Sequence, residues 1–200
     1  MNNLLPTWVF FFSLLLGTLN AQTVSGPVVS ELEYELYERV MEYRAERRLP
    51  RIPLSRSLSI VAQTHVRDLE EQQPVRGQCN LHSWSNAGPW SKCCYTGSVE
   101  SAPCMWDKPR ELTSYPGNGY EIAYWSSDAA TPAEALSGWK GSKGHNAVIV
   151  QKGLWKDTRW NAIGIGIYGS YAVIWFGEEP DAEGGPIVPL PQRTLDATRP

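Results

Sequence analysis

The fold of this 200-residue chain is decided by the stretch Ala162-Ile163-Gly164-Ile165-Gly166-Ile167, in which isoleucine and glycine alternate. Alternation with a period of two is typical of a strand that has one apolar face. The glycine face has no side chains, so another backbone can approach it closely. A second apolar run, Ala172-Val173-Ile174-Trp175-Phe176, follows the turn residues Tyr168-Gly169-Ser170-Tyr171. The sequence therefore predicts an antiparallel hairpin.

Three helices are predicted ahead of this hairpin. The first begins at a capping box formed by Ser30 and Glu33 and runs to about Arg47. The second starts near Ser55 or Ser57, and its apolar face carries Leu58, Val61, Ala62, His65 and Leu69. The third begins at Thr131-Pro132-Ala133-Glu134, with a threonine cap and proline in the first turn, and stops by Gly141 or Gly144.

Two further short strands are expected, at Gly119 to Trp125 and at Ala147 to Val150. Residues 73 to 118, rich in proline, glycine, serine and tryptophan, are expected to form a long loop. Helices, a loop, a helix and then antiparallel strands make an α+β layout. We expect a three-layer α-β-α sandwich around a small, mainly antiparallel sheet.

The two ends are expected to lie outside the domain. Val9 to Leu16 is an apolar run too short to span a bilayer, and Ala21 ends a small-residue segment suited to cleavage. Residues 1–21 therefore read as a secretory signal peptide, residues 22–180 as the domain and residues 181–200 as a disordered tail. We expect a secreted, extracellular protein that is not an integral membrane protein. The net charge of −3, without long runs, gives no basic footprint for nucleic acid.

Four cysteines fall close together, and in an exported chain they read as two disulfides. They are Cys79, Cys93, Cys94 and Cys104. Adjacent cysteines rarely pair with each other, because their side chains diverge. Two connectivities remain open: Cys79–Cys93 with Cys94–Cys104, or Cys79–Cys94 with Cys93–Cys104. A Cys/His zinc cluster is the alternative, although the chain has no Cys-x-x-Cys pair.

The candidate site comes from three separate segments. His82 and His145 lie in short stretches rich in glycine and aromatic residues, and Glu121 lies in a third between them. Two imidazoles and a carboxylate are the ligands of a catalytic-type zinc site, or the acid/base groups of a hydrolase. The third histidine, His65, falls on the apolar face of the second helix. We expect it to be a core residue outside the site.

The ordered set of motifs resembles the CAP superfamily, which comprises cysteine-rich secretory proteins, antigen 5 allergens and plant pathogenesis-related proteins, and whose domain is also called SCP-like. The resemblance covers about residues 31 to 178. It rests on Tyr43-Arg44-Ala45-Glu46, Leu49-Pro50 with Pro53-Leu54, Ala62-Gln63-x-His65, Cys79-x-x-His82-Ser83, Gly119-Tyr120-Glu121-Ile122-Ala123, Trp139, Gly144-His145 and the Gly164/Gly166 strand.

The resemblance implies a central cleft that carries two histidines and two glutamates in its fullest form. His82, Glu121 and His145 match three of these positions, and Ser142 stands where the second glutamate is expected. Tyr120 is a further departure, since it stands between the glycine and the glutamate of the motif. A domain of binding or interaction type is implied, whose cleft can hold Zn²⁺ or another divalent cation and whose ligands include proteins, lipids and sterols.

A secreted hydrolase, either a peptidase or an esterase, is the alternative function for the same cleft. Ser142 lies three residues before His145, and Glu121 could orient an imidazole. No strand leads into Ser142, so the strand–turn–helix context of a nucleophile elbow is absent from the predicted pattern. We therefore favour a binding role without turnover.

The exported protein should begin at Gln22 and contain no free thiols. Intact-mass measurement before and after reduction and alkylation tests both points, because each disulfide hides two thiols from the reagent. Alkylation of the native exported protein without prior reduction would contradict the disulfide assignment.

Overall fold

The computed structural model describes residues 26–189. The segment assigned to the signal peptide and the last part of the predicted tail, residues 190–200, lie outside this range. The elements follow in the order α1 (Glu31–Ala45), α2 (Arg56–Gln72), α3 (Pro103–Trp106), α4 (Lys108–Leu112), β1 (Tyr120–Trp125), α5 (Pro132–Gly141), α6 (Lys143–Ile149), the 3₁₀ turn η1 (Gly153–Trp155), β2 (Ala162–Tyr168) and β3 (Tyr171–Gly177).

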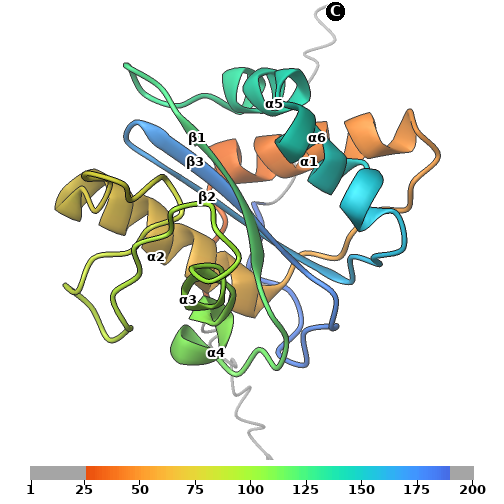
Figure 1. The fold of residues 1–200 in the computed structure, drawn as a ribbon. Coiled ribbons are helices and arrows are strands. Elements are labelled where there is room, and N and C mark those ends of the chain that lie inside the picture. Colours follow the sequence, from red (N-terminus) through yellow and green to blue (C-terminus); the bar gives the residue numbers. More distant parts are fainter. Residues whose placement is uncertain (1–25, 190–200) are drawn as a thin grey trace, which may run out of the picture.

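The molecule is an α+β sandwich with a three-stranded antiparallel sheet in the middle, as predicted. The strand order is β1-β3-β2, so the predicted hairpin is present and β1 pairs with its second strand. Figure 1 shows α2, α3 and α4 on one side of the sheet and α1, α5 and α6 on the other. Alternate residues of each strand therefore face two separate apolar cores.

Helix α2 lies directly against the glycines of β2. A Cβ atom added to Gly164 would stand 2.1 Å from the backbone carbonyl carbon of Leu58, and one added to Gly166 would stand 2.4 Å from the carbonyl oxygen of Ala62. Ile163 and Ile165, which alternate with these glycines, face the opposite core. The predicted close approach to the glycine face is confirmed, and the approaching backbone is that of α2.

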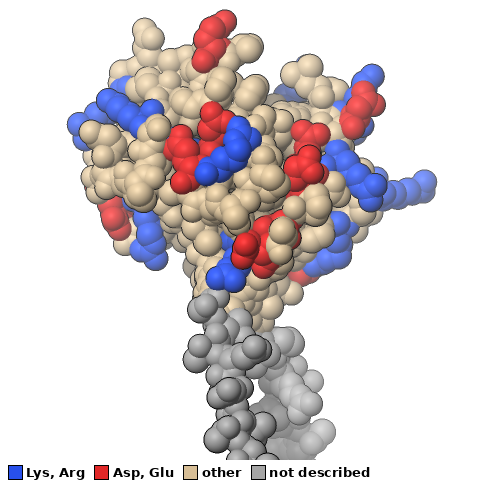
Figure 2. Space-filling model, turned by 90° about the horizontal axis from the view of Figure 1, so that it is seen from below, with Lys and Arg blue, Asp and Glu red and all other residues tan. Residues whose placement is uncertain are grey.

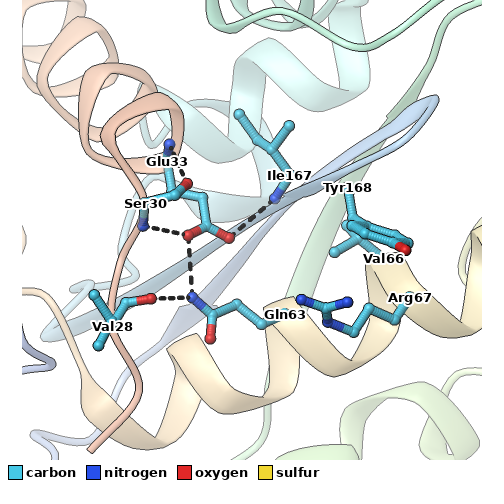
Figure 3. A pocket seen from close by; sticks show the side chains of 8 residues that line it. All are labelled: Val28, Ser30, Glu33, Gln63, Val66, Arg67, Ile167 and Tyr168. Atoms are coloured by element: carbon cyan, nitrogen blue, oxygen red, sulfur yellow. Dashed lines mark hydrogen bonds between the residues drawn. The ribbon is translucent and has the colours of Figure 1, made fainter.

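The outer edge of β2 is closed by the capping box of α1. The Glu33 carboxylate accepts hydrogen bonds from the Ser30 and Ile167 backbone amides at 2.7 and 3.2 Å, and from the Gln63 side chain at 3.0 Å. Figure 3 shows these bonds at the wall of a small pocket between α1, α2 and β2. All three donors to the buried carboxylate belong to the fold, so we assign this pocket a structural role.

Helix α6 replaces the strand that the sequence predicted at Ala147 to Val150, and that prediction is wrong. Ser142 caps the helix, since its side chain accepts from the His145 amide at 3.5 Å. Val148 and Ile149 are buried on one side of the helix. An apolar run this short cannot be assigned to a helix or a strand by its periodicity. The expected loop between residues 73 and 118 also contains two short helices, α3 and α4.

The domain extends beyond the boundary predicted at residue 180. Asp181 accepts hydrogen bonds from the Ser55 hydroxyl at 2.6 Å and the Ser57 amide at 2.8 Å, where α2 begins. Ile187 exchanges backbone hydrogen bonds with the segment before α1. Residues 181 to 189 therefore pack on the domain. The composition of this segment, rich in Asp, Gly and Pro, suggested a tail because it lacks large apolar residues.

The surface carries charges of both signs. Figure 2 shows acidic and basic side chains interspersed on the face seen from below, without an extended patch of either sign. Within residues 26–189, no helix has the length and hydropathy needed to cross a bilayer.

Replacing Gly164 by alanine should destabilise the protein by about 1–3 kcal/mol or more, because the new methyl group meets the rigid backbone of α2. Gly141→Ala is the matched control, since no atom lies within 4 Å of its added Cβ. Urea denaturation of both variants measures the difference. Equal midpoints for the two variants would contradict the close packing of α2 on β2.

Candidate functional site

The centre of the site is a buried carboxylate held between two imidazoles. Glu121 lies on β1, and its side chain is fully buried. Its Oε1 lies 2.5 Å from His65 Nδ1, and its Oε2 lies 2.7 Å from His82 Nδ1. The three residues come from α2, from the loop after it and from β1. Both oxygens of Glu121 are therefore engaged by histidine.

Two opposing effects act on the acidity of Glu121. Burial raises its pKa, because the charged form loses water. The positive charge of His65 and the hydrogen bonds from both imidazoles oppose this effect and hold the pKa below its ordinary value. Glu121 is thus a carboxylate at neutral pH and accepts hydrogen bonds from both sides.

His82 is positioned by a tightly bonded loop. Its amide donates to the Asn80 side chain at 3.0 Å, and the Asn80 amide donates to the Tyr95 carbonyl oxygen at 2.9 Å. The Tyr95 amide in turn donates to the Ser83 hydroxyl at 3.0 Å. The Tyr95 ring stands edge-on to the His82 ring, with centroids 5.4 Å apart. The His82 side chain is 15% exposed, so one edge of the ring reaches solvent.

Two disulfides fix this loop. Cys79 pairs with Cys94, and Cys93 pairs with Cys104, which selects the second of the two connectivities left open by the sequence. All four cysteines of the chain are thereby used. The alternative of a Cys/His zinc cluster is wrong, since a disulfide sulfur is no longer a thiolate ligand. The Cys79–Cys94 disulfide anchors the segment that carries His82.

His145 approaches from the other layer of the sandwich. It lies on α6, which is anchored to α1 because Tyr43 donates to the Asn146 side chain at 2.9 Å and Arg44 donates to the Ile149 carbonyl oxygen at 2.6 Å. Its ring centroid lies 6.5 Å from that of His82, at an interplanar angle of 74°. Burial, followed by the charge of His82, lowers the pKa of His145, while Glu121 opposes the shift. The half-buried His145 ring is thus neutral at neutral pH.

The structure brings together the three residues singled out by sequence, and it adds a fourth. His65 is fully buried, as expected, but the expectation that it stands outside the site is wrong, because it bonds directly to Glu121. Its position on the apolar face of α2 predicted burial. No sequence signal identified its partner, because Glu121 is 56 residues away along the chain.

Ser142 lies beside the site without joining it chemically. Its hydroxyl caps α6 at the His145 amide, and no hydrogen bond connects it to an imidazole among the described residues. Glu121 orients His65 and His82 rather than His145. The Ser142–His145–Glu121 relay considered for a hydrolase is therefore not formed.

The predicted three-ligand metal set also differs from the observed arrangement. Within residues 26–189, no three His, Cys, Asp or Glu side chains are arranged to hold a metal ion. Both oxygens of Glu121 bond to histidine instead. Among the histidine ring nitrogens of the described range, Nε2 of His82 and both nitrogens of His145 remain without a hydrogen-bond partner.

Replacing Glu121 by glutamine should cost about 3–5 kcal/mol of unfolding free energy at pH 7, because it removes a buried carboxylate that is hydrogen-bonded by two imidazoles. The lowered pKa of Glu121 means that its stabilisation is present above pH 4.5, the ordinary value, and is lost as the pH falls further towards the folded-state pKa. The gap between wild type and Glu121→Gln should therefore shrink below pH 4.5. Denaturant unfolding from pH 7 to pH 3 measures this gap.

Glu35→Gln is the control, since Glu35 forms only an exposed helical pair with Arg39. It should leave both the stability and its pH dependence almost unchanged. A gap for Glu121→Gln that stays constant down to pH 3 would contradict the buried carboxylate.

The fold was compared with known proteins. No family model and no curated protein sequence matches the chain. Among solved structures, an extracellular protein containing an SCP domain from Bacillus anthracis matches with a TM-score of 0.51 and 16% identity over 74% of this chain and 40% of that one. The chain thus spans about 40% of the length of that protein.

Two further structures match less closely in shape. A cysteine-rich secretory protein from Staphylococcus aureus has a TM-score of 0.47 and 14% identity, over 74% of this chain and 39% of that one. An outer surface protein from Borrelia burgdorferi has a TM-score of 0.49 and 14% identity, over 75% of this chain and 96% of that one. At these identities the similarity concerns the fold, and the match to the Bacillus anthracis protein carries the assignment. The order of helices and strands, the antiparallel sheet between two helical layers and this match together identify the SCP, or CAP, fold.

Proposed function

We propose that this protein is an extracellular CAP-type domain that binds a divalent cation through His82 and His145. The observation that carries this proposal is the bond between His82 Nδ1 and Glu121 at 2.7 Å, which leaves Nε2 of His82 available on the other side of the ring. A carboxylate behind a histidine is the usual arrangement that orients a metal-binding imidazole. Glu121 then supports the site without contacting the ion.

The donor set fits a site with two protein ligands. The two imidazoles stand edge-to-face, with ring centroids 6.5 Å apart and an interplanar angle of 74°. Two imidazoles on one tetrahedral zinc have centroids roughly 5 Å apart, given Zn–N distances of about 2.0–2.1 Å. A small rotation of the half-buried His145 ring towards His82 would close this difference. The lowered pKa of His145 favours binding, because only a neutral imidazole can be a ligand.

A bound ion would supply a Lewis acid with positions left for water or for a ligand group. The residues of the chain have separate tasks. His82 and His145 would hold the ion, Glu121 orients His82, and the hydrogen bonds of Tyr43 and Arg44 hold α6 in place.

An extracellular location is supported by the two disulfides. Such bonds persist in oxidising compartments and are rare in the cytosol. The apolar segment ending near Ala21, which lies outside the described residues, is consistent with export.

A secreted hydrolase remains the second candidate, and one observation favours it. A histidine bonded through Nδ1 to a buried carboxylate is the arrangement of a general base. The corresponding nucleophile is not provided by Ser142, whose hydroxyl caps α6. A hydrolase of this kind would therefore use His82 to activate water.

The wild-type protein should take up Zn²⁺, and replacing both His82 and His145 by alanine should abolish uptake while the fold is retained. Calorimetric titration and metal analysis measure uptake. Affinity should fall as the pH drops through the range where imidazoles become protonated, near an ordinary pKa of about 6.5. Because the pKa of His145 is lowered, His145 should stay competent to more acidic pH than an exposed histidine.

Ser142→Ala separates the metal site from a hydrolase that would use Ser142, the only serine considered from the sequence, as its nucleophile. It keeps both imidazoles, so zinc uptake should persist, apart from a loss of stability of about 1 kcal/mol from the missing helix cap. Zinc uptake by the double alanine variant equal to that of wild type would contradict the metal proposal. Turnover of peptide or ester substrates that disappears in Ser142→Ala would establish a serine hydrolase instead.

A further inference from the structure

His65 has an unusual environment for a core histidine. Its side chain is fully buried, and both ring nitrogens have partners. Nδ1 lies 2.5 Å from Glu121 Oε1, and Nε2 lies 3.0 Å from the Ser83 carbonyl oxygen. Ser83 follows His82 directly in the chain, so His65 bonds both to the carboxylate behind His82 and to the backbone beside it.

The hydrogen bonds determine where the protons sit. The Ser83 carbonyl oxygen can only accept, so Nε2 of His65 carries a proton. Nδ1 of His65 shares a proton with Glu121 Oε1 across the 2.5 Å hydrogen bond. The Trp84 ring lies parallel to the His65 ring at 4.2 Å between centroids, with an interplanar angle of 5°, and fixes the plane of the imidazole.

The same reasoning fixes the tautomer of His82. Glu121 Oε2 accepts from His82 Nδ1, so this nitrogen carries the proton when the His82 ring is neutral. Nε2 of His82 is then the unprotonated nitrogen. It is the atom that a metal ion or a substrate proton requires.

We propose that His65 is a positioning residue that sets the tautomer of His82 through Glu121. The bond from His65 Nδ1 holds Glu121 Oε1 in place, so that Oε2 stays aimed at His82 Nδ1, and the Ser83 bond holds the His82 loop at the correct distance. This inference rests on the proposed function, because it assigns His65 to the support of the same site. It adds a residue that touches neither the ion nor His145.

Two conservative variants separate positioning from simple packing. In His65→Asn, the amide can replace Nδ1 as the donor to Glu121, while the Ser83 bond is lost. In His65→Gln, the amide can replace Nε2 as the donor to Ser83, while the bond to Glu121 is lost. Asp68→Asn is the matched stability control, since buried Asp68 ties α2 to the same loop through the Ser85 amide at 2.8 Å without contacting Glu121.

The test is nitrogen-detected NMR of the histidine rings in the metal-free exported protein, followed by zinc titration. We expect a proton on Nε2 of His65 and a single Nδ1–H tautomer for His82 in wild type. His65→Gln should give a mixture of His82 tautomers and lower zinc affinity by about 10–100-fold, the usual effect of removing an outer hydrogen-bond partner. His65→Asn should retain most of both properties, and Asp68→Asn should retain them fully.

An unchanged His82 tautomer in folded His65→Gln would overturn the positioning role. So would unfolding of both His65 variants under conditions where Asp68→Asn stays folded, because His65 would then act through stability alone. Absence of zinc uptake by wild type would contradict the proposed function, while a tautomer change in His65→Gln would still support the role of His65. Equal zinc affinity in wild type and His65→Gln would overturn that role and leave the metal proposal intact.

Discussion

The burial of the Glu121 carboxylate is the constraint on which the rest of the site depends. A buried charge is costly unless it is paired and fully hydrogen-bonded. Here both oxygens bond to imidazoles, one from α2 and one from the disulfide-bonded loop. Three segments that are distant in sequence must therefore meet at one point. The tautomer of His82 and the position of its loop are linked to α2 through this one side chain.

How closely α2 approaches the sheet is determined by a different, purely steric feature. Because Gly164 and Gly166 carry no side chains, the backbone of α2 reaches the surface of β2. This close approach places His65 within hydrogen-bonding distance of Glu121, which faces the same layer from β1. A larger residue at either glycine would lift the helix and lengthen the bond to Glu121. The alternation of isoleucine and glycine thus serves the site as well as the fold.

Much of the architecture could be predicted from the sequence, because it depends on local signals. The caps at Ser30 and Thr131 and the period-two pattern of β2 are examples, and the elements they predict are present. The strand predicted at Ala147 to Val150 was wrong, because four apolar residues fit either a helix or a strand. The N-cap at Ser142 favours the helix. Asp181 is packed on the domain through hydrogen bonds to the residues that begin α2, and the composition of its segment does not indicate these bonds.

The candidate site could be predicted from the sequence only in part. The proximity of its three predicted residues could be predicted, because the resemblance to the CAP motifs indicated their order and spacing. The structure places the three residues together. The role of each residue depends on which atoms face each other, and this is a property of packing. The pairing of Glu121 with His65 shows the difference, since sequence indicated that His65 was buried but could not indicate its partner. The absence of a relay through Ser142 has a similar cause. Its hydroxyl caps α6, part of which the sequence predicted to be a strand.

The central claim is that Glu121 orients His82 and does not contact a metal ion. A high-resolution crystal structure of the zinc-loaded protein tests it most directly. The account predicts Zn²⁺ bound by His82 Nε2 and a His145 nitrogen at about 2.0–2.1 Å, with water completing the coordination. Both oxygens of Glu121 should remain bonded to His65 and His82. A Glu121 oxygen bound to the ion at about 2.0–2.2 Å, with its bond to either histidine broken, would contradict the account.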